Sequence, residues 1–93
     1  MKEIKNGMLA VSRAGHDKGT LYMIMDVTET ELLLCDGKIR TAEHPKKKKR
    51  SHVQIIHQIP ENWKDRDVQK LRNEEIRSGL KNYSGGLKCQ KQM

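Results

Sequence analysis

Short apolar segments separated by polar turns are the feature of this sequence that most limits how it can fold. Five such segments lie between positions 8 and 59, and none shows the spacing of an amphipathic helix. They occupy residues 8–13, 20–27, 31–35, 38–42 and 53–59. We therefore expect a mainly β fold with five short strands. A pair of stacked sheets fits this pattern too, but the short chain favours a small barrel, which leaves no exposed sheet edge.

Turn residues set the boundaries of the predicted strands. Asp36 and Gly37 tolerate the backbone of a two-residue hairpin turn, so residues 38–42 should return alongside 31–35 as the fourth strand. Pro45 lacks a backbone N–H and biases the preceding residue to an extended shape. The fourth strand should therefore end near Glu43, before the proline.

A helical pattern replaces the strand pattern after Pro60. The spacing predicts a helix from about Trp63 to Asn82, ended by Ser84-Gly85-Gly86. Gly79 weakens this helix by about 1 kcal/mol relative to Ala, so it should be stable only if docked, with Trp63 as the anchor. The predicted organisation is a barrel over 1–60, a helix over 61–83 and a flexible tail over 84–93.

The composition argues against an enzyme. Hydrophobic residues make up only 34% of the 93 residues and Phe is absent, which leaves little room for a deep substrate pocket. Cys35 sits in an apolar strand and should be a buried thiol, and the four histidines lack metal-ligand spacing. We expect no catalytic residues, metal, cofactor or small-molecule substrate. No apolar run approaches the roughly 20 residues of a membrane span. Two distant cysteines and no apolar N-terminal signal favour the reducing cytoplasm.

Positive charge is concentrated in one run. The net charge is +7, and residues 46–60 contain five basic residues and no acidic one. The run Lys46-Lys47-Lys48-Lys49-Arg50 should form a loop between the fourth and fifth strands, held at both ends and facing a polyanion. A solvated loop or a sorting signal is the alternative. A structure in which these lysines pair with the chain's own carboxylates would argue against a polyanion-binding loop.

The segment from Val11 to Gly19, followed by an apolar strand, resembles a KOW motif, in which Gly19 matches the required glycine. Asp36-Gly37-Lys38 and the run from Pro45 to Lys49 extend the resemblance over about residues 7–58. This region is similar to the KOW domain of the large-subunit ribosomal proteins of the archaeal and eukaryotic fourteen-e type and their short bacterial relatives. The resemblance implies an SH3-like barrel that binds structured RNA, namely large-subunit ribosomal RNA, with ribosomal proteins as further neighbours.

The expected RNA contacts are phosphate contacts from cationic side chains. Gly19 would let the backbone approach a phosphate, and His16 would donate to a phosphate or stack on a base, or else be an ordinary exposed histidine. Because exposed aromatic residues are scarce, we expect recognition of shape and charge more than of base sequence. The candidate residues are Arg13, His16, Lys18, Gly19, Arg40, His44, Lys46, Lys47, Lys48, Lys49, Arg50 and His52.

A protein-interaction module is the alternative function. KOW-type barrels can bind proteins of the translation or transcription machinery, and the predicted helix could lie in a partner's groove through Trp63, Leu71, Ile76 and Leu80. The cations of the same helix could instead lie along RNA.

Overall fold

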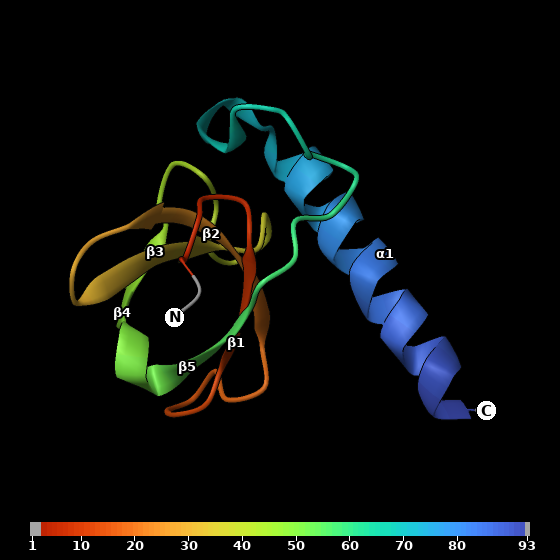
Figure 1. Ribbon diagram of the computed structural model, residues 1–93, viewed down its shortest axis with the longest axis horizontal. Helices are drawn as coiled ribbons and strands as arrows, with labels where there is room; N and C mark the ends of the chain where they lie inside the picture. The colour runs from red at the N-terminus through yellow and green to blue at the C-terminus, as the bar shows by residue number, and fades with distance from the viewer. Residues whose placement is uncertain (1–2, 93) are drawn as a thin grey trace.

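A five-stranded antiparallel sheet and one long helix form the structure, a computed structural model that describes the backbone of residues 3–92 and the side chains of residues 3–84 (Figure 1). The strand order is β4-β3-β2-β1-β5, and the 3-10 turn η1 (Arg50–His52) connects the two edge strands. Within the described residues no ladder joins β4 to β5, so the sheet curls without closing into a hydrogen-bonded barrel. The strands are β1 (Leu9–Ser12), β2 (Leu21–Val27), β3 (Glu31–Cys35), β4 (Lys46–Lys49) and β5 (Val53–Ile56).

Both faces of the sheet are covered by apolar side chains. Successive residues of a strand point to opposite faces, so neighbours such as Tyr22 and Met23 enter different clusters. The concave face holds Met8, Ala10, Tyr22, Ile24, Leu32, Leu34 and Val53. The other face packs Leu9, Met23 and Cys35 against residues from the C-terminal third of the chain, namely Trp63, Val68, Leu71, Ile76 and Leu80.

The fourth strand differs from the prediction. Residues 38–42 are not a strand, because the Asp36 side chain holds a turn: its Oδ1 accepts the N–H groups of Lys38 (2.9 Å) and Arg40 (3.0 Å). Such side-chain bonds compete with a β ladder for the same backbone donors. The true fourth strand begins after Pro45 and consists of the lysine run itself. Proline is tolerated just before or at the start of a strand, so Pro45 opens this strand and does not end an earlier one.

The helix α1 (Asn73–Gln92) begins later than predicted. The segment from Pro60 to Arg72 instead forms turns, including η2 (Val68–Lys70), where the Asp67 carboxylate accepts the Gln69 N–H at 3.1 Å. The backbone helix passes through Ser84-Gly85-Gly86, where an end was predicted. The side chains of residues 85–93, within the predicted flexible tail, lie outside the described part of the chain.

Trp63 docks α1 onto the sheet, as predicted. Its indole Nε1–H donates to the Gly7 carbonyl at 2.9 Å, and its ring lies against Gly79 so closely that a Cβ there would collide with it. Gly79 is therefore required for docking, although glycine weakens a helix in isolation. The apolar residues that a partner's groove would need, Leu71, Ile76 and Leu80, are buried in the protein's own core.

Candidate functional site

The lysine run is divided between the two faces of the sheet. Lys46 and Lys48 pair in register with Leu34 and Leu32 of β3, so they share the concave face. Lys47 and Lys49 alternate with them and are exposed on the opposite face. The prediction that the five cations form one loop facing a polyanion is therefore wrong, because the ladder with β3 turns two of the lysines inward.

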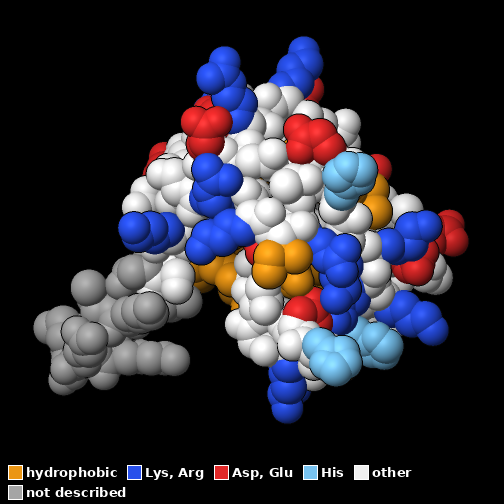
Figure 2. Space-filling view, turned by 180° about the vertical axis from the view of Figure 1, so that it is seen from behind, with side chains coloured by type: hydrophobic (Ala, Val, Ile, Leu, Met, Phe, Trp, Pro, Cys, Tyr) orange, Lys and Arg blue, Asp and Glu red, His pale blue; other side chains and the backbone are white. Residues whose placement is uncertain are grey.

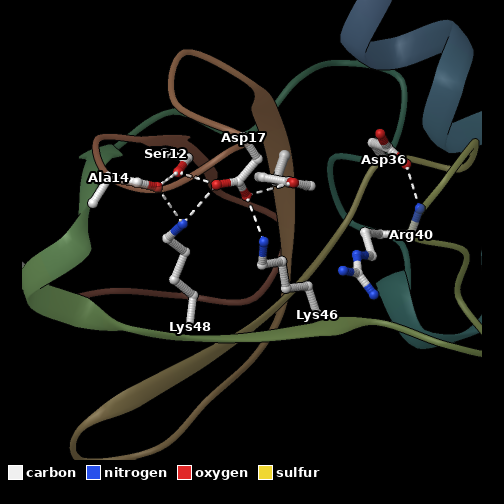
Figure 3. A network of polar contacts seen from close by, with 8 residues as sticks. Ser12, Ala14, Asp17, Asp36, Arg40, Lys46 and Lys48 are labelled. Atoms are coloured by element: carbon white, nitrogen blue, oxygen red, sulfur yellow. Dashed lines mark hydrogen bonds and ion pairs between the residues drawn. The ribbon is translucent and has the colours of Figure 1, made fainter.

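The Asp17 carboxylate accepts hydrogen bonds from the ammonium groups of both inward-facing lysines (Figure 3). Its Oδ1 lies 2.7 Å from Lys48 Nζ, and its Oδ2 lies 3.0 Å from Lys46 Nζ. The Lys48 ammonium also donates to the Ala14 carbonyl at 2.8 Å. The side chain of Lys48 is 9% exposed and that of Lys46 is 26% exposed. These two lysines are thus paired with a carboxylate of the protein itself, which argues against their binding a polyanion.

Two hydroxyl groups complete the coordination of the Asp17 carboxylate. Ser12 Oγ donates to Oδ1 and Tyr22 Oη donates to Oδ2, each at 2.8 Å. Burial alone would raise the pKa of Asp17, but the hydrogen bonds from Lys48, Tyr22, Lys46 and Ser12 outweigh it and hold the pKa well below its usual range. Burial and the Asp17 charge together raise the pKa of the Tyr22 phenol. We call Asp17, Lys46, Lys48, Ser12 and Tyr22 the Asp17 cluster.

The Asp17 cluster joins the β1–β2 loop (residues 13–20) to β4. The sequence left open whether this loop and the basic run share one side of the fold, and the two ion pairs place them in contact. The Arg13 N–H also donates to the His52 carbonyl at 2.9 Å, which brings the loop against η1. Arg13, His16, Lys18 and His52 are exposed. The structure therefore brings the β1–β2 loop, η1 and β4 together, as the predicted site requires. The group at their centre is the partly buried Asp17 carboxylate.

Gly19 ends this loop with a φ of +91°, a conformation that favours glycine. Nothing lies within 4 Å of the position that a Cβ would take, so this side of the backbone is open to a ligand. The Gly19 N–H itself donates to the Ser12 carbonyl at 2.8 Å. Gly19 therefore lets a ligand approach the backbone closely, but its N–H already donates to the Ser12 carbonyl and is not free to bind that ligand.

Of the remaining predicted residues, Arg40 lies near the Asp17 cluster, because its charge acts on the Tyr22 phenol and its side chain points toward Lys46 (Figure 3). Arg40 and His44 are exposed in the β3–β4 connection, and Arg50 is half-buried with its Nη1 donating to the Glu29 carbonyl at 2.9 Å. Figure 2 shows that Lys and Arg side chains on one face are spread among Asp and Glu, and that two histidines lie side by side near its lower right edge. The positive charge on this face is therefore dispersed among acidic side chains.

The Cys35 thiol is shielded from solvent and resists ionisation. Cys35 is buried, as predicted, and burial, helped by the Asp36 and Glu43 charges, raises the pKa of its thiol to about 12. In the described part of the chain, no group of three His, Cys, Asp or Glu side chains could hold a metal ion. No helix among the residues searched is long and apolar enough to cross a membrane.

Asp17 is the functional residue that the sequence analysis missed. It stands between His16 and Lys18, two of the predicted RNA-binding residues, and the sequence analysis assigns it no role. A signal was present: once 46–49 is taken as a strand, alternation places two lysines beside Leu32 and Leu34, and buried ammonium groups need a carboxylate. Searches of the whole sequence against protein-family models and against curated proteins found no match.

Proposed function

We propose that the protein binds structured RNA through phosphate contacts, as a ribosomal or ribosome-associated protein, with the β1–β2 loop and η1 as the contact surface. The strand order β4-β3-β2-β1-β5 and the 3-10 turn between β4 and β5 support an SH3-like barrel, in line with the KOW resemblance. The expected RNA contact lies in the β1–β2 loop and not in the lysine run, because the ammonium groups of Lys46 and Lys48 are already paired with the Asp17 carboxylate.

The Asp17 cluster is the observation that carries this proposal. Asp17 is the only acidic residue in the loop, and its carboxylate accepts two ammonium groups and two hydroxyls from within the protein. The charges that the loop and the adjoining η1 present to a partner are therefore those of Arg13, Lys18 and the half-buried Arg50, and the exposed side chains of His16 and His52 lie beside them. A rigid loop presenting only cations matches a phosphate backbone, and holding it in place lowers the entropy lost on binding.

The salt dependence of binding follows from the number of free cations. Each phosphate neutralised adds roughly 0.7–0.9 to the slope of log affinity against log salt. Five contacts from the lysine run would give a slope near −4, whereas Arg13 and Lys18 alone give about −1.4 to −1.8. The smaller value is the expectation from the structure for a short RNA that contacts only the loop.

Filter binding to ribosomal RNA fragments across a salt series tests the proposal. The double variant Arg13→Gln, Lys18→Gln should flatten the slope by about 1.5. The matched control is Lys5→Gln, Lys70→Gln, which removes the same charge from two exposed lysines outside the loop and η1. Absence of salt-sensitive binding at low salt would overturn the proposal. Sedimentation with the large ribosomal subunit at moderate salt tests the ribosomal association separately.

Burial of the helix disfavours the protein-interaction alternative in the form in which it was predicted. That reading places the apolar face of the helix in a partner's groove, but Trp63, Ile76 and Leu80 pack on the sheet of this chain. A partner's groove could take up this whole apolar face only if the helix left the sheet. RNA binding through the loop requires no such change.

A further inference from the structure

A groove of about 790 Å³ lies between α1, the start of β2 and the 36–40 turn. Leu21 and Leu80 provide apolar surface along it, and Thr20 and Ser78 provide hydroxyl groups. The ammonium groups of Lys38 and Lys81 line it and are exposed. Its volume falls within the roughly 300–1,000 Å³ of small-molecule sites, so it can hold a group as large as a nucleotide.

The groove begins at the residues that end the β1–β2 loop and follow it in the sequence. Thr20 and Leu21 follow the last residue of the Gly15–Gly19 segment, and the Thr20 N–H donates to the Asp17 carbonyl at 2.9 Å. The wall of the groove is thus tied to the residue that fixes the β1–β2 loop.

The walls of the groove are held in place by hydrogen bonds between the turn and the helix. Arg77 Nη1 donates to the Gly37 carbonyl at 2.7 Å, and the Ala42 N–H donates to Asn73 Oδ1 at 2.8 Å. Gly37 packs so tightly that a Cβ there would collide with the Asn73 carbonyl. A groove formed before binding loses less free energy when a ligand enters.

The charges along the groove are polarised. Asp36 also lines it, but its Oδ1 already accepts two backbone N–H groups of its own turn. Glu74 lies in the first turn of α1, whereas Lys81 lies about 10 Å further along the helix axis, at 1.5 Å per residue. With Lys38, Arg77 and Lys81 against Asp36 and Glu74, the groove has an excess of positive charge that favours an anion, and the apolar surface favours a flat uncharged group beside it.

We propose that this groove receives one unpaired nucleotide of the RNA that the β1–β2 loop holds, with the base against Leu21 and Leu80 and a phosphate beside Lys38 and Lys81. This inference rests on the proposed RNA-binding function and adds to it a preference for RNA with an unpaired nucleotide. A base within a duplex cannot enter, because only unstacked bases can be turned outward into a protein site.

Two RNA probes separate this inference from the proposed function: a short RNA duplex, and the same duplex with a one-nucleotide bulge. The unmodified protein should bind the bulged duplex about fivefold more tightly, as expected when part of a base is buried against apolar surface. Ser78→Trp fills the groove from an exposed position and should remove this advantage while leaving duplex binding unchanged. Asn62→Trp adds the same ring at an exposed residue outside the groove and should retain it.

Each outcome is decisive. Equal binding of the two RNAs by the unmodified protein, or an advantage that survives Ser78→Trp, overturns the nucleotide site and leaves the proposed function standing. Absence of binding to either RNA overturns the proposed function and the nucleotide site together. As a second measurement, the variant Lys38→Gln, Lys81→Gln should lower the salt slope for the bulged duplex by about 1 and leave that for the plain duplex unchanged.

Discussion

Lys48 Nζ lies 2.7 Å from Asp17 Oδ1, so an ammonium group from an edge strand and a carboxylate from the β1–β2 loop meet at the side of the sheet (Figure 3). The two side chains are 9% and 14% exposed. Forming an ion pair this far from solvent costs desolvation free energy. Removing only one of its two side chains destabilises the protein even more, because the remaining charge loses its partner. The Asp17 cluster therefore both fixes the loop and limits how much positive charge β4 presents.

Asp17→Asn should destabilise the protein by about 2–4 kcal/mol, because two partly buried ammonium groups lose their counter-charge. The amide is nearly isosteric with the carboxylate, so the loss reports charge and not volume. Urea unfolding measures it as a lower midpoint with an unchanged slope. Glu61→Gln is the control: it breaks only a 3.9 Å ion pair between exposed side chains and should cost under about 0.5 kcal/mol.

Lys48→Met and Lys47→Met form a matched pair on adjacent residues of β4. Lys48→Met removes the shorter ion pair of Asp17 and should cost about 1–3 kcal/mol. Lys47 is exposed on the opposite face, so Lys47→Met should change the free energy of unfolding by less than about 0.5 kcal/mol. Chemical denaturation of both variants checks the alternation. Equal losses would contradict the division of the run between two faces.

The acid sensitivity of the fold should depend on Asp17. Its pKa is lowered in the folded state, so the unfolded chain binds more protons below its own carboxyl pKa. The stabilisation is present above about pH 4, the unfolded value, and is lost as the pH falls toward the folded pKa. Urea midpoints between pH 6 and pH 2 should fall more steeply for the unmodified protein than for Asp17→Asn. Parallel curves would show that the cluster does not hold this carboxyl ionised.

Gly79→Ala should destabilise the domain, although alanine favours a helix by about 1 kcal/mol over glycine. The new methyl group would collide with the buried Trp63 ring, and overpacking of this kind costs about 1–3 kcal/mol beyond the helix gain. Thermal unfolding followed by Trp63 fluorescence measures the change. Ser78→Ala, at the neighbouring exposed position, carries the helix gain without the collision and should be neutral or slightly stabilising.

Four of the five strands could be predicted from the sequence, because alternating apolar residues and glycine turns are local signals. The segments around Leu9, Met23, Leu34 and Ile55 all lie in the sheet. Trp63 could be predicted as a helix anchor, since a large apolar ring in a polar segment has to be buried. The start of α1 could not, because the Pro60–Arg72 segment contains helix-forming residues whose conformation depends on packing against the sheet.

The sequence by itself determined a small β domain, four of its five strands and the concentration of cations at 46–50. Only the tertiary structure decided that four consecutive lysines are a strand, and that two of them face inward. Lysine prefers water strongly enough that local reasoning places such a run in a loop. The outcome is reversed by contacts distant in sequence: β3 supplies the ladder, and Asp17, 29 and 31 positions away from Lys46 and Lys48, supplies the counter-charge that makes their burial possible.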